Sequence, residues 1–101
     1  MSPTEQPLDA AAVARYIQHT RIEADASRAD MLTHARECVE YGFNAAMVPG
    51  SWVEVVAAEL AGTNVLVASA LDFPIVGTMT SAGKAFEAAE LVRIGAAQID
   101  I

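Results

Sequence analysis

The sequence predicts an α/β fold in which parallel β-strands alternate with helices. Helix-like and strand-like patterns follow one another along the 101 residues, in repeats of roughly 20–30 residues. The strand-like segments are almost continuously apolar, as is typical of parallel strands that are covered on both faces. A hydrophobic content of 53% excludes a disordered tail, and the length allows one small domain or part of a larger one.

The first elements are a helix and a short strand. We expect residues 1–7 to form a flexible polar leader, and residues 8–101 to form the folded part. Residues 9–15 are good helix formers, with Asp9 as the N-cap. Residues 16–20 are rich in aromatic and β-branched side chains and predict the first strand.

A second helix and a second strand follow a polar turn. Ser27 and Asp30 have the spacing of a capping box, and apolar residues then recur on one helical face. Gly42 is placed to cap the C-terminus of this helix. Residues 43–48 form an apolar run of strand length, which Pro49 ends.

The third and fourth units repeat this order. Ser51 and Glu54 match a capping box and predict a helix to about Ala61, followed by a strand over residues 63–71. The last unit consists of a loop over 72–79, a helix over 81–94 and a strand over 96–101. Thr80 or Ser81 caps the helix.

Two arrangements of these units remain open. Right-handed crossovers allow an open doubly wound sheet or a TIM (βα)8 barrel. No G-x-G-x-x-G follows the first strand and no P-loop is present, which favours the barrel. A barrel of about 250 residues cannot close with four strands. We therefore expect the first half of such a barrel, incomplete by itself.

The composition excludes several classes of partner. Thirteen acidic residues stand against 6 basic ones, for a net charge of −7, which disfavours nucleic acid and anionic membranes. Cys38 is the single cysteine, so an internal disulfide and a cysteine-based zinc cluster are excluded. The N-terminus lacks the pattern of a signal peptide and no apolar run is long enough to span a membrane. We expect a cytoplasmic protein.

Candidate site residues lie where strands end, because barrel active sites form at the C-terminal ends of the strands. Gln18, His19 and Thr20 end the first strand, Asp72 follows the third, and Asp100 lies in the fourth. Since a carboxylate in an apolar strand is costly unless it is paired or used, Asp100 is either a general acid/base or partner of a lysine, or a strand-end acid that faces solvent. The sequence leaves these alternatives open.

The remaining polar candidates favour structural roles. We interpret His19 as a hydrogen-bonded strand-end histidine and His34 as a solvated mid-helix residue, and we expect no metal, because their spacing does not fit a metal site. Lys84, the only lysine, begins a helix where little desolvates its amine, which argues against a catalytic role. Residues 72–81 form either a site for an anion or a sugar hydroxyl, or an ordinary capped βα loop. Trp52 is expected in the core or an interface.

Over residues 13–101 these segments together resemble the deoxyribose-phosphate aldolase family. The matching segments, in chain order, are Tyr16-Ile17-Gln18-His19-Thr20, Glu40-Tyr41-Gly42-Phe43 with Met47-Val48-Pro49, Asp72-Phe73-Pro74, Lys84-Ala85-Phe86-Glu87-Ala88, and Gly95-Ala96-Ala97-Gln98-Ile99-Asp100. The family's versions read Asp-His-Thr, Cys-Val-Asn-Pro, Gly-Phe-Pro, Lys-x-x-Glu-Ala and Gly-Ala-x-Glu-Ile-Asp. Five matches in order, at the right spacing, make the resemblance specific.

The resemblance implies a (βα)8 barrel and a class I aldolase without metal or other cofactor. Such an enzyme cleaves 2-deoxyribose 5-phosphate to acetaldehyde and glyceraldehyde 3-phosphate through a Schiff base on a lysine. The proton-transferring acid maps onto Asp100, whereas the family's two lysines and phosphate-binding loops map beyond residue 101. We therefore expect a sugar phosphate or aldehyde as substrate of the whole parent, and no activity from this chain alone. The alternative is a non-catalytic half-barrel that forms a homodimer through open sheet edges, as an interaction or sugar-phosphate-binding module.

Several departures from the family pattern fall in the expected pocket. Gln18 stands where the family usually has an aspartate, and Asp72 replaces the glycine before Phe-Pro. Met47 replaces a common cysteine, and Pro49-Gly50 replaces Asn-Pro. We expect Gln18, Thr20 and Asp72 to bind substrate, and the departures suggest another substrate or a loss of function.

Overall fold

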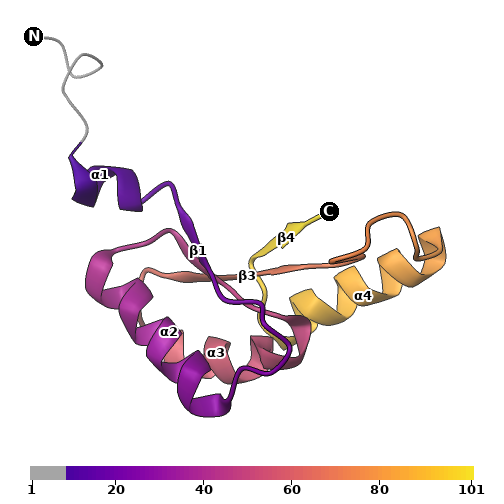
Figure 1. Cartoon of the computed structure of the whole chain (residues 1–101), viewed down its shortest axis with the longest axis horizontal. Helices are drawn as coiled ribbons and strands as arrows, with labels where there is room; N and C mark the ends of the chain where they lie inside the picture. The colour runs from indigo at the N-terminus through magenta and orange to yellow at the C-terminus, as the bar shows by residue number, and fades with distance from the viewer. Residues whose placement is uncertain (1–8) are drawn as a thin grey trace, which may run out of the picture.

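The structure, a computed structural model, describes residues 9–101, so the expected leader over residues 1–7 lies outside the described part (Figure 1). The helices are α1 (Ala10–Ala14), α2 (Arg28–Tyr41), the 3-10 helix η2 (Gly50–Trp52), α3 (Val53–Leu60) and α4 (Ser81–Ile94). The strands are β1 (Gln18–Thr20), β2 (Ala45–Met47), β3 (Leu66–Ala70) and β4 (Gln98–Asp100).

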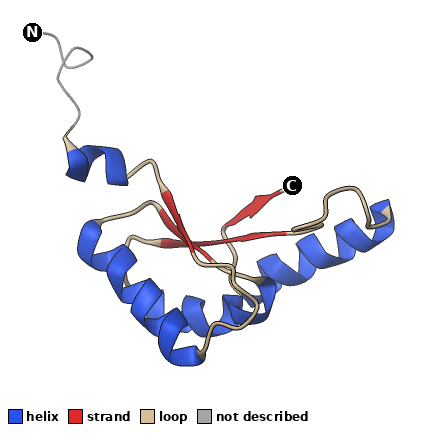
Figure 2. Ribbon diagram, in the orientation of Figure 1, coloured by secondary structure: helices blue, strands red, loops and turns tan. Residues whose placement is uncertain are grey.

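The four strands form one parallel sheet in the order β1-β2-β3-β4. Each strand pairs with the next one along the chain, as in Gln18 with Ala45 and Ala68 with Gln98. Because all strands run in one direction, their carboxyl ends lie at the same edge of the sheet. The expected alternation of parallel strands with helices is confirmed (Figure 2).

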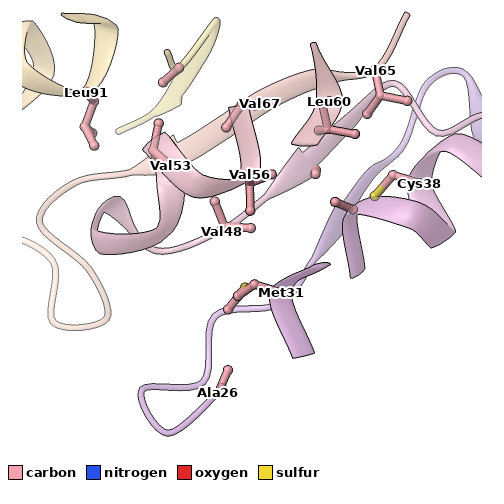
Figure 3. Packing of buried hydrophobic residues seen from close by; sticks show 13 residues of the cluster. Ala26, Met31, Cys38, Val48, Val53, Val56, Leu60, Val65, Val67 and Leu91 are labelled. Carbon is pink, nitrogen blue, oxygen red and sulfur yellow. The ribbon is translucent and has the colours of Figure 1, made fainter. Parts of the chain in front are cut away.

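Helices α2, α3 and α4 lie together on one side of the strands (Figure 1). The main core fills the space between them and the sheet, with Met31 and Cys38 from α2, Val56 from α3 and Leu91 from α4 all essentially inaccessible to water (Figure 3). Burial of each such side chain contributes roughly 1.5–3 kcal/mol. This packing fixes one face of the sheet and leaves the other face, here called the open face, turned away from these helices.

Capping residues set the helix ends where the sequence indicates. Ser27 accepts a hydrogen bond from the N–H of Asp30, whose carboxylate accepts one from the N–H of Ser27, so the capping box is confirmed. Gly42 ends α2 with φ 70°, a left-handed conformation that glycine adopts without steric cost. Thr80 caps α4 by accepting from the N–H of Gly83.

The second capping box was a wrong prediction. The N–H of Trp52 donates to the carbonyl of Pro49 at 2.9 Å, so the chain already turns as η2 before α3 begins. Ser51 lies inside that turn rather than before the helix, and the residue in the cap position of α3, Trp52, makes no side-chain cap. Trp52 packs partly buried against the main core, as expected.

The expected solvation of His34 was also wrong. His34 is only 3% exposed, because it follows Met31 by three residues and precedes Cys38 by four, and therefore lies on the buried face of α2. The four strands are each shorter than their predicted ranges, since the ends of the apolar runs continue as loop. Among residues 9–101, no helix has the length and apolarity that crossing a membrane requires.

Candidate functional site

Three of the expected site residues lie on the open face of the sheet. Gln18 pairs with Ala45 and Thr20 with Met47, while Asp100 pairs with Ala70. Because side chains alternate between the faces of a strand, residues two apart point the same way. The open face therefore gathers side chains from the first and last strands of the sheet above small residues of the middle strands.

A hydrogen-bonded chain of amides joins β1 to β4 on this face. The Nε2 of Gln18 donates to Oε1 of Gln98 at 2.8 Å and to Oδ1 of Asp100 at 3.4 Å. The Nε2 of Gln98 donates in turn to Oδ1 of Asn44 at 2.8 Å. Sequence reasoning did not identify Gln98 or Asn44 as site residues, although the two-residue spacing of Gln98 and Asp100 already placed both on one face.

A hollow of about 260 Å³ opens beside Asp100 at the carboxyl edge of the sheet. Its walls are mostly apolar and include Ile22, Met47, Leu71 and Phe73. The side chains of Thr20 and Asp100 supply its polar groups. The hollow can hold a small, largely apolar molecule with a hydroxyl that donates to the carboxylate.

The Asp72 carboxylate organises its own loop. It accepts backbone N–H bonds from Gly77 at 2.6 Å, Thr78 at 3.1 Å and Met79 at 2.9 Å, and the Nζ of Lys84 lies 3.4 Å away. These interactions, the Gly77 N–H bond first, lower the pKa of Asp72 from 3.8 to about 2. The carboxylate is thus occupied by protein groups, and its role as a substrate ligand stays a prediction.

Lys84 lies in the first turn of α4 with its side chain 42% exposed. Its amine contacts the Asp72 carboxylate rather than an apolar pocket. A lysine that forms a Schiff base is activated by desolvation or by a second cation. Neither is provided at this position, which supports the structural role expected from the sequence.

His19 lies on the helical side of the sheet, away from Asp100. Its Nε2 is 3.2 Å from Oε2 of Glu37, and its ring stacks on Phe43 with centroids 4.7 Å apart. The expected hydrogen-bonded strand-end histidine is therefore confirmed. The ring of His34 lies 4.6 Å from that of His19, and burial followed by the proximity of His19 lowers the pKa of His34. Over residues 9–101, no group of three or more His, Cys, Asp or Glu side chains is placed to hold a metal ion.

Comparisons with known proteins relate the chain to one group of enzymes. The deoxyribose-phosphate aldolase of Micrococcus luteus is 39% identical over 94 residues, which are 93% of this chain and 41% of that protein. The enzyme of the same name from Geobacillus sp. is 37% identical over 89 residues, or 88% and 40%. No protein-family model matches. The chain thus spans about two fifths of the length of these relatives.

Solved structures give the same relationship. A candidate deoxyribose-phosphate aldolase from Coccidioides immitis superimposes with a TM-score of 0.87 at 28% identity, over 92% of this chain and 36% of that one. The aldolase from Aeropyrum pernix, at 24% identity and a TM-score of 0.83, shows the fold alone. The four parallel strands and their helices therefore match part of a TIM barrel. By these matches, the chain is similar to the deoxyribose-phosphate aldolase family, as the counterpart of its members' N-terminal portion.

Proposed function

We propose that the 101 residues form the N-terminal portion of an aldolase-type barrel and carry its acid–base residue. The observation that carries the proposal is the placement of Asp100 at the carboxyl end of β4, beside the 260 Å³ hollow and within reach of Gln18. Carboxylates so placed transfer protons to and from bound substrates. The relatives are named deoxyribose-phosphate aldolases, and we accordingly propose 2-deoxyribose 5-phosphate as the substrate of the whole barrel.

Within the proposed reaction, each residue of the open face has a separate task. The Asp100 carboxylate accepts and returns the proton at the reacting carbon or its hydroxyl, and the Thr20 hydroxyl, which donates to the carbonyl of Gln18 at 3.3 Å, accepts a hydrogen bond from the substrate. Gln18 contacts the substrate from the opposite strand. The Schiff-base lysine is supplied by strands outside the 101 residues, since Lys84 is held by Asp72. The chain alone is accordingly inactive, and no metal or cofactor takes part.

Complementation tests this proposal. The chain is co-expressed with the part of the Micrococcus luteus relative that does not align with it, and cleavage of 2-deoxyribose 5-phosphate is measured. We expect cleavage only when both polypeptides are present, a loss of at least 100-fold on Asp100→Asn, in line with the effect of removing an acid–base catalyst, and no loss on Lys84→Arg. Arginine preserves the ion pair with Asp72 but cannot form a Schiff base.

Chemical trapping provides a second, independent test. The chain alone is treated with acetaldehyde and borohydride, and its peptides are analysed by mass spectrometry. We expect no stable adduct on Lys84. A stoichiometric adduct there would place the nucleophile within this chain. It would contradict the proposal that the Schiff-base lysine lies outside the 101 residues.

The second candidate function is a half-barrel that pairs with a second copy of itself. Its support is the exposure of large apolar side chains, with Phe86 of α4 79% and Ile101, directly after β4, 98% accessible. Burying such side chains favours association. Light scattering distinguishes the candidates, because a monodisperse monomer at micromolar concentration contradicts the dimer and leaves the aldolase portion intact.

We further propose that the protein is cytoplasmic. Cys38 is fully buried as a free thiol, and burial raises its pKa to about 11. A thiol of this kind is inert and forms no disulfide. This state fits a reducing compartment, and fractionation of the source cells would check it.

A further inference from the structure

The amide chain on the open face links four residues that are far apart in sequence. Gln18 and Gln98 are separated by 80 positions, and Gln98 and Asn44 by 54. The strands that carry Gln18 and Gln98 lie at opposite ends of the sheet order. Their side chains meet above Ala45 and Ala68, both fully buried alanines whose methyl groups leave room for the crossing amides.

The far end of the amide chain is firmly anchored. The backbone N–H of Asn44 donates to the carbonyls of Ile17 at 3.0 Å and Ala14 at 3.2 Å, and its own carbonyl accepts from Leu66 at 3.1 Å. Asn44 is thereby tied to the segment before β1 and to β3. Since its backbone is fixed on both sides, its side-chain oxygen is a fixed acceptor for Gln98.

Donation starts at Gln18 and runs in two directions, to Asp100 on one side and through Gln98 to Asn44 on the other. The amide group of Gln18 has two hydrogens, and both are used, one on Gln98 and one on Asp100. Gln98 accepts one of them and donates to Asn44. If Gln98 lost its amide, the Gln18 side chain would lose its shorter bond, of 2.8 Å, and keep only the longer one, of 3.4 Å, to Asp100.

Within this network, only the Asp100 carboxylate can transfer a proton. Primary amides do not titrate in the physiological range, so Gln18, Gln98 and Asn44 orient but cannot carry a proton. Asp100 is the one titratable group of this hydrogen-bonded network. Among the other charged groups at the carboxyl edge, Asp72 is paired with Lys84, and Arg21 with Glu23 and Asp30.

We propose that Gln98, anchored by Asn44, is a positioning residue that orients the Asp100 carboxylate through Gln18. The orientation itself rests only on the contacts above, whereas its effect on turnover rests on the proposed aldolase function. Holding one carboxylate oxygen against Gln18 directs the other into the hollow that Asp100 lines.

The first test needs no activity. Side-chain amide resonances of Gln18 and the carboxyl carbon resonance of Asp100 are followed by NMR in the 101-residue chain, in Gln98→Met and in Asn64→Ala. Methionine keeps the length of the side chain without its hydrogen bonds, and Asn64 lies in an exposed turn outside the network. We expect Gln98→Met to shift both sets of resonances and Asn64→Ala to shift neither. Unchanged resonances in a folded Gln98→Met variant overturn the proposal.

The second test uses the complemented enzyme. We expect Gln98→Met to lower kcat about tenfold with KM changed less than about twofold, because a misdirected catalytic group affects the chemical step. Gln98→Glu keeps an acceptor for Gln18 and adds a second carboxylate, so the pH profile of kcat should gain an ionisation that Gln98→Met lacks. An unaltered kcat in Gln98→Met contradicts the positioning role. If the complemented wild type is itself inactive, the proposed function fails, while the NMR test still decides the inference.

Discussion

His34 is a buried histidine whose Nε2 has no hydrogen-bond partner within the described part of the chain. Burial and the neighbouring ring of His19 lower its pKa below 6.5, while Glu37 on the same helix acts in the opposite direction. The unfolded chain therefore binds a proton at higher pH than the folded chain does. Its contribution to stability is fully present above about pH 6.5 and declines as the pH falls below that value.

We expect the urea midpoint of unfolding to decrease between pH 7.5 and pH 5.5, and to decrease less in His34→Met, which fills a similar volume without titrating. Urea titrations at a series of pH values measure this. His19→Gln serves as the control for the neighbouring ring. A wild type and a His34→Met variant with parallel pH profiles would show that His34 does not contribute.

Gly95 has a specific steric requirement where α4 turns into β4. It adopts φ 123°, and a Cβ at this position would lie 2.7 Å from the Cβ of Ala57. Gly62 also has a positive φ, 82°, but with open space around it. We expect Gly62→Ala to cost about 1–2 kcal/mol from backbone strain alone, and Gly95→Ala to cost more because α3 and α4 must also separate. Chemical denaturation of the two variants checks the difference, and equal losses would exclude the contact with Ala57 as its cause.

At the scale of elements, the loop over residues 72–80 depends on a single carboxylate. Asp72 has φ 58°, a conformation that asparagine also tolerates, so Asp72→Asn removes the charge without new backbone strain. The amide would turn its N–H₂ group either toward the N–H of Gly77, which donates to Oδ2, or toward the N–H groups of Thr78 and Met79, which donate to Oδ1. We expect Asp72→Asn to lower the melting temperature by several degrees, and the exposed control Asp25→Asn to leave it unchanged.

The stability of this loop should decrease as the pH falls, because the pKa of Asp72 is lowered rather than raised. The pKa of Asp72 is depressed from 3.8 to about 2, so its stabilising contribution is complete above about pH 4 and is lost as the pH falls toward 2. Amide hydrogen exchange at Thr78 and Met79 should therefore accelerate relative to the core between pH 4 and pH 2, after correction for intrinsic rates. Uniform protection across this range would contradict the central role of Asp72.

Local sequence signals predicted the elements well and their connections less well. The capping box at Ser27 and the C-terminal cap at Gly42 depend on neighbouring residues only, so the sequence was sufficient. Ser51 has the same local pattern, yet the turn that follows Pro49 takes it into η2. A local sequence pattern cannot show whether Ser51 caps α3 or lies within the preceding turn, because tertiary packing determines where that turn lies.

The open face was predicted only in part, for a related reason. The position at a strand end pointed to Gln18 and Thr20, and the apolar strand around it, together with the family resemblance, pointed to Asp100. The bond between Gln18 and Gln98 depends on the curvature of the whole sheet, which brings the end strands close enough for their side chains to meet. No pattern within either strand contains that information.

At the scale of the whole molecule, α4 has an apolar side that faces none of the described helices. Ala82, Ala85, Ala89 and Val92 recur at spacings of three and four residues and are all exposed, Val92 by 60%. In a barrel, the next βα unit packs beside this helix and β4. The complementing polypeptide of the proposed function would therefore contact Val92, whereas Val39, in the groove between α2 and α3, already has both neighbouring helices.

We expect Val92→Lys to weaken complementation at least tenfold, since the loss of a buried valine contact corresponds to roughly 1.5–3 kcal/mol. Val39→Lys introduces the same charge on a comparably exposed valine, 45% accessible, and should leave complementation unchanged. Titration of the complementing polypeptide against each variant, with cleavage of 2-deoxyribose 5-phosphate as the signal, gives the two affinities. Equal weakening would mean that charge alone, rather than the α4 side, controls association. A selective loss in Val92→Lys would identify this side of α4 as the surface on which the barrel continues.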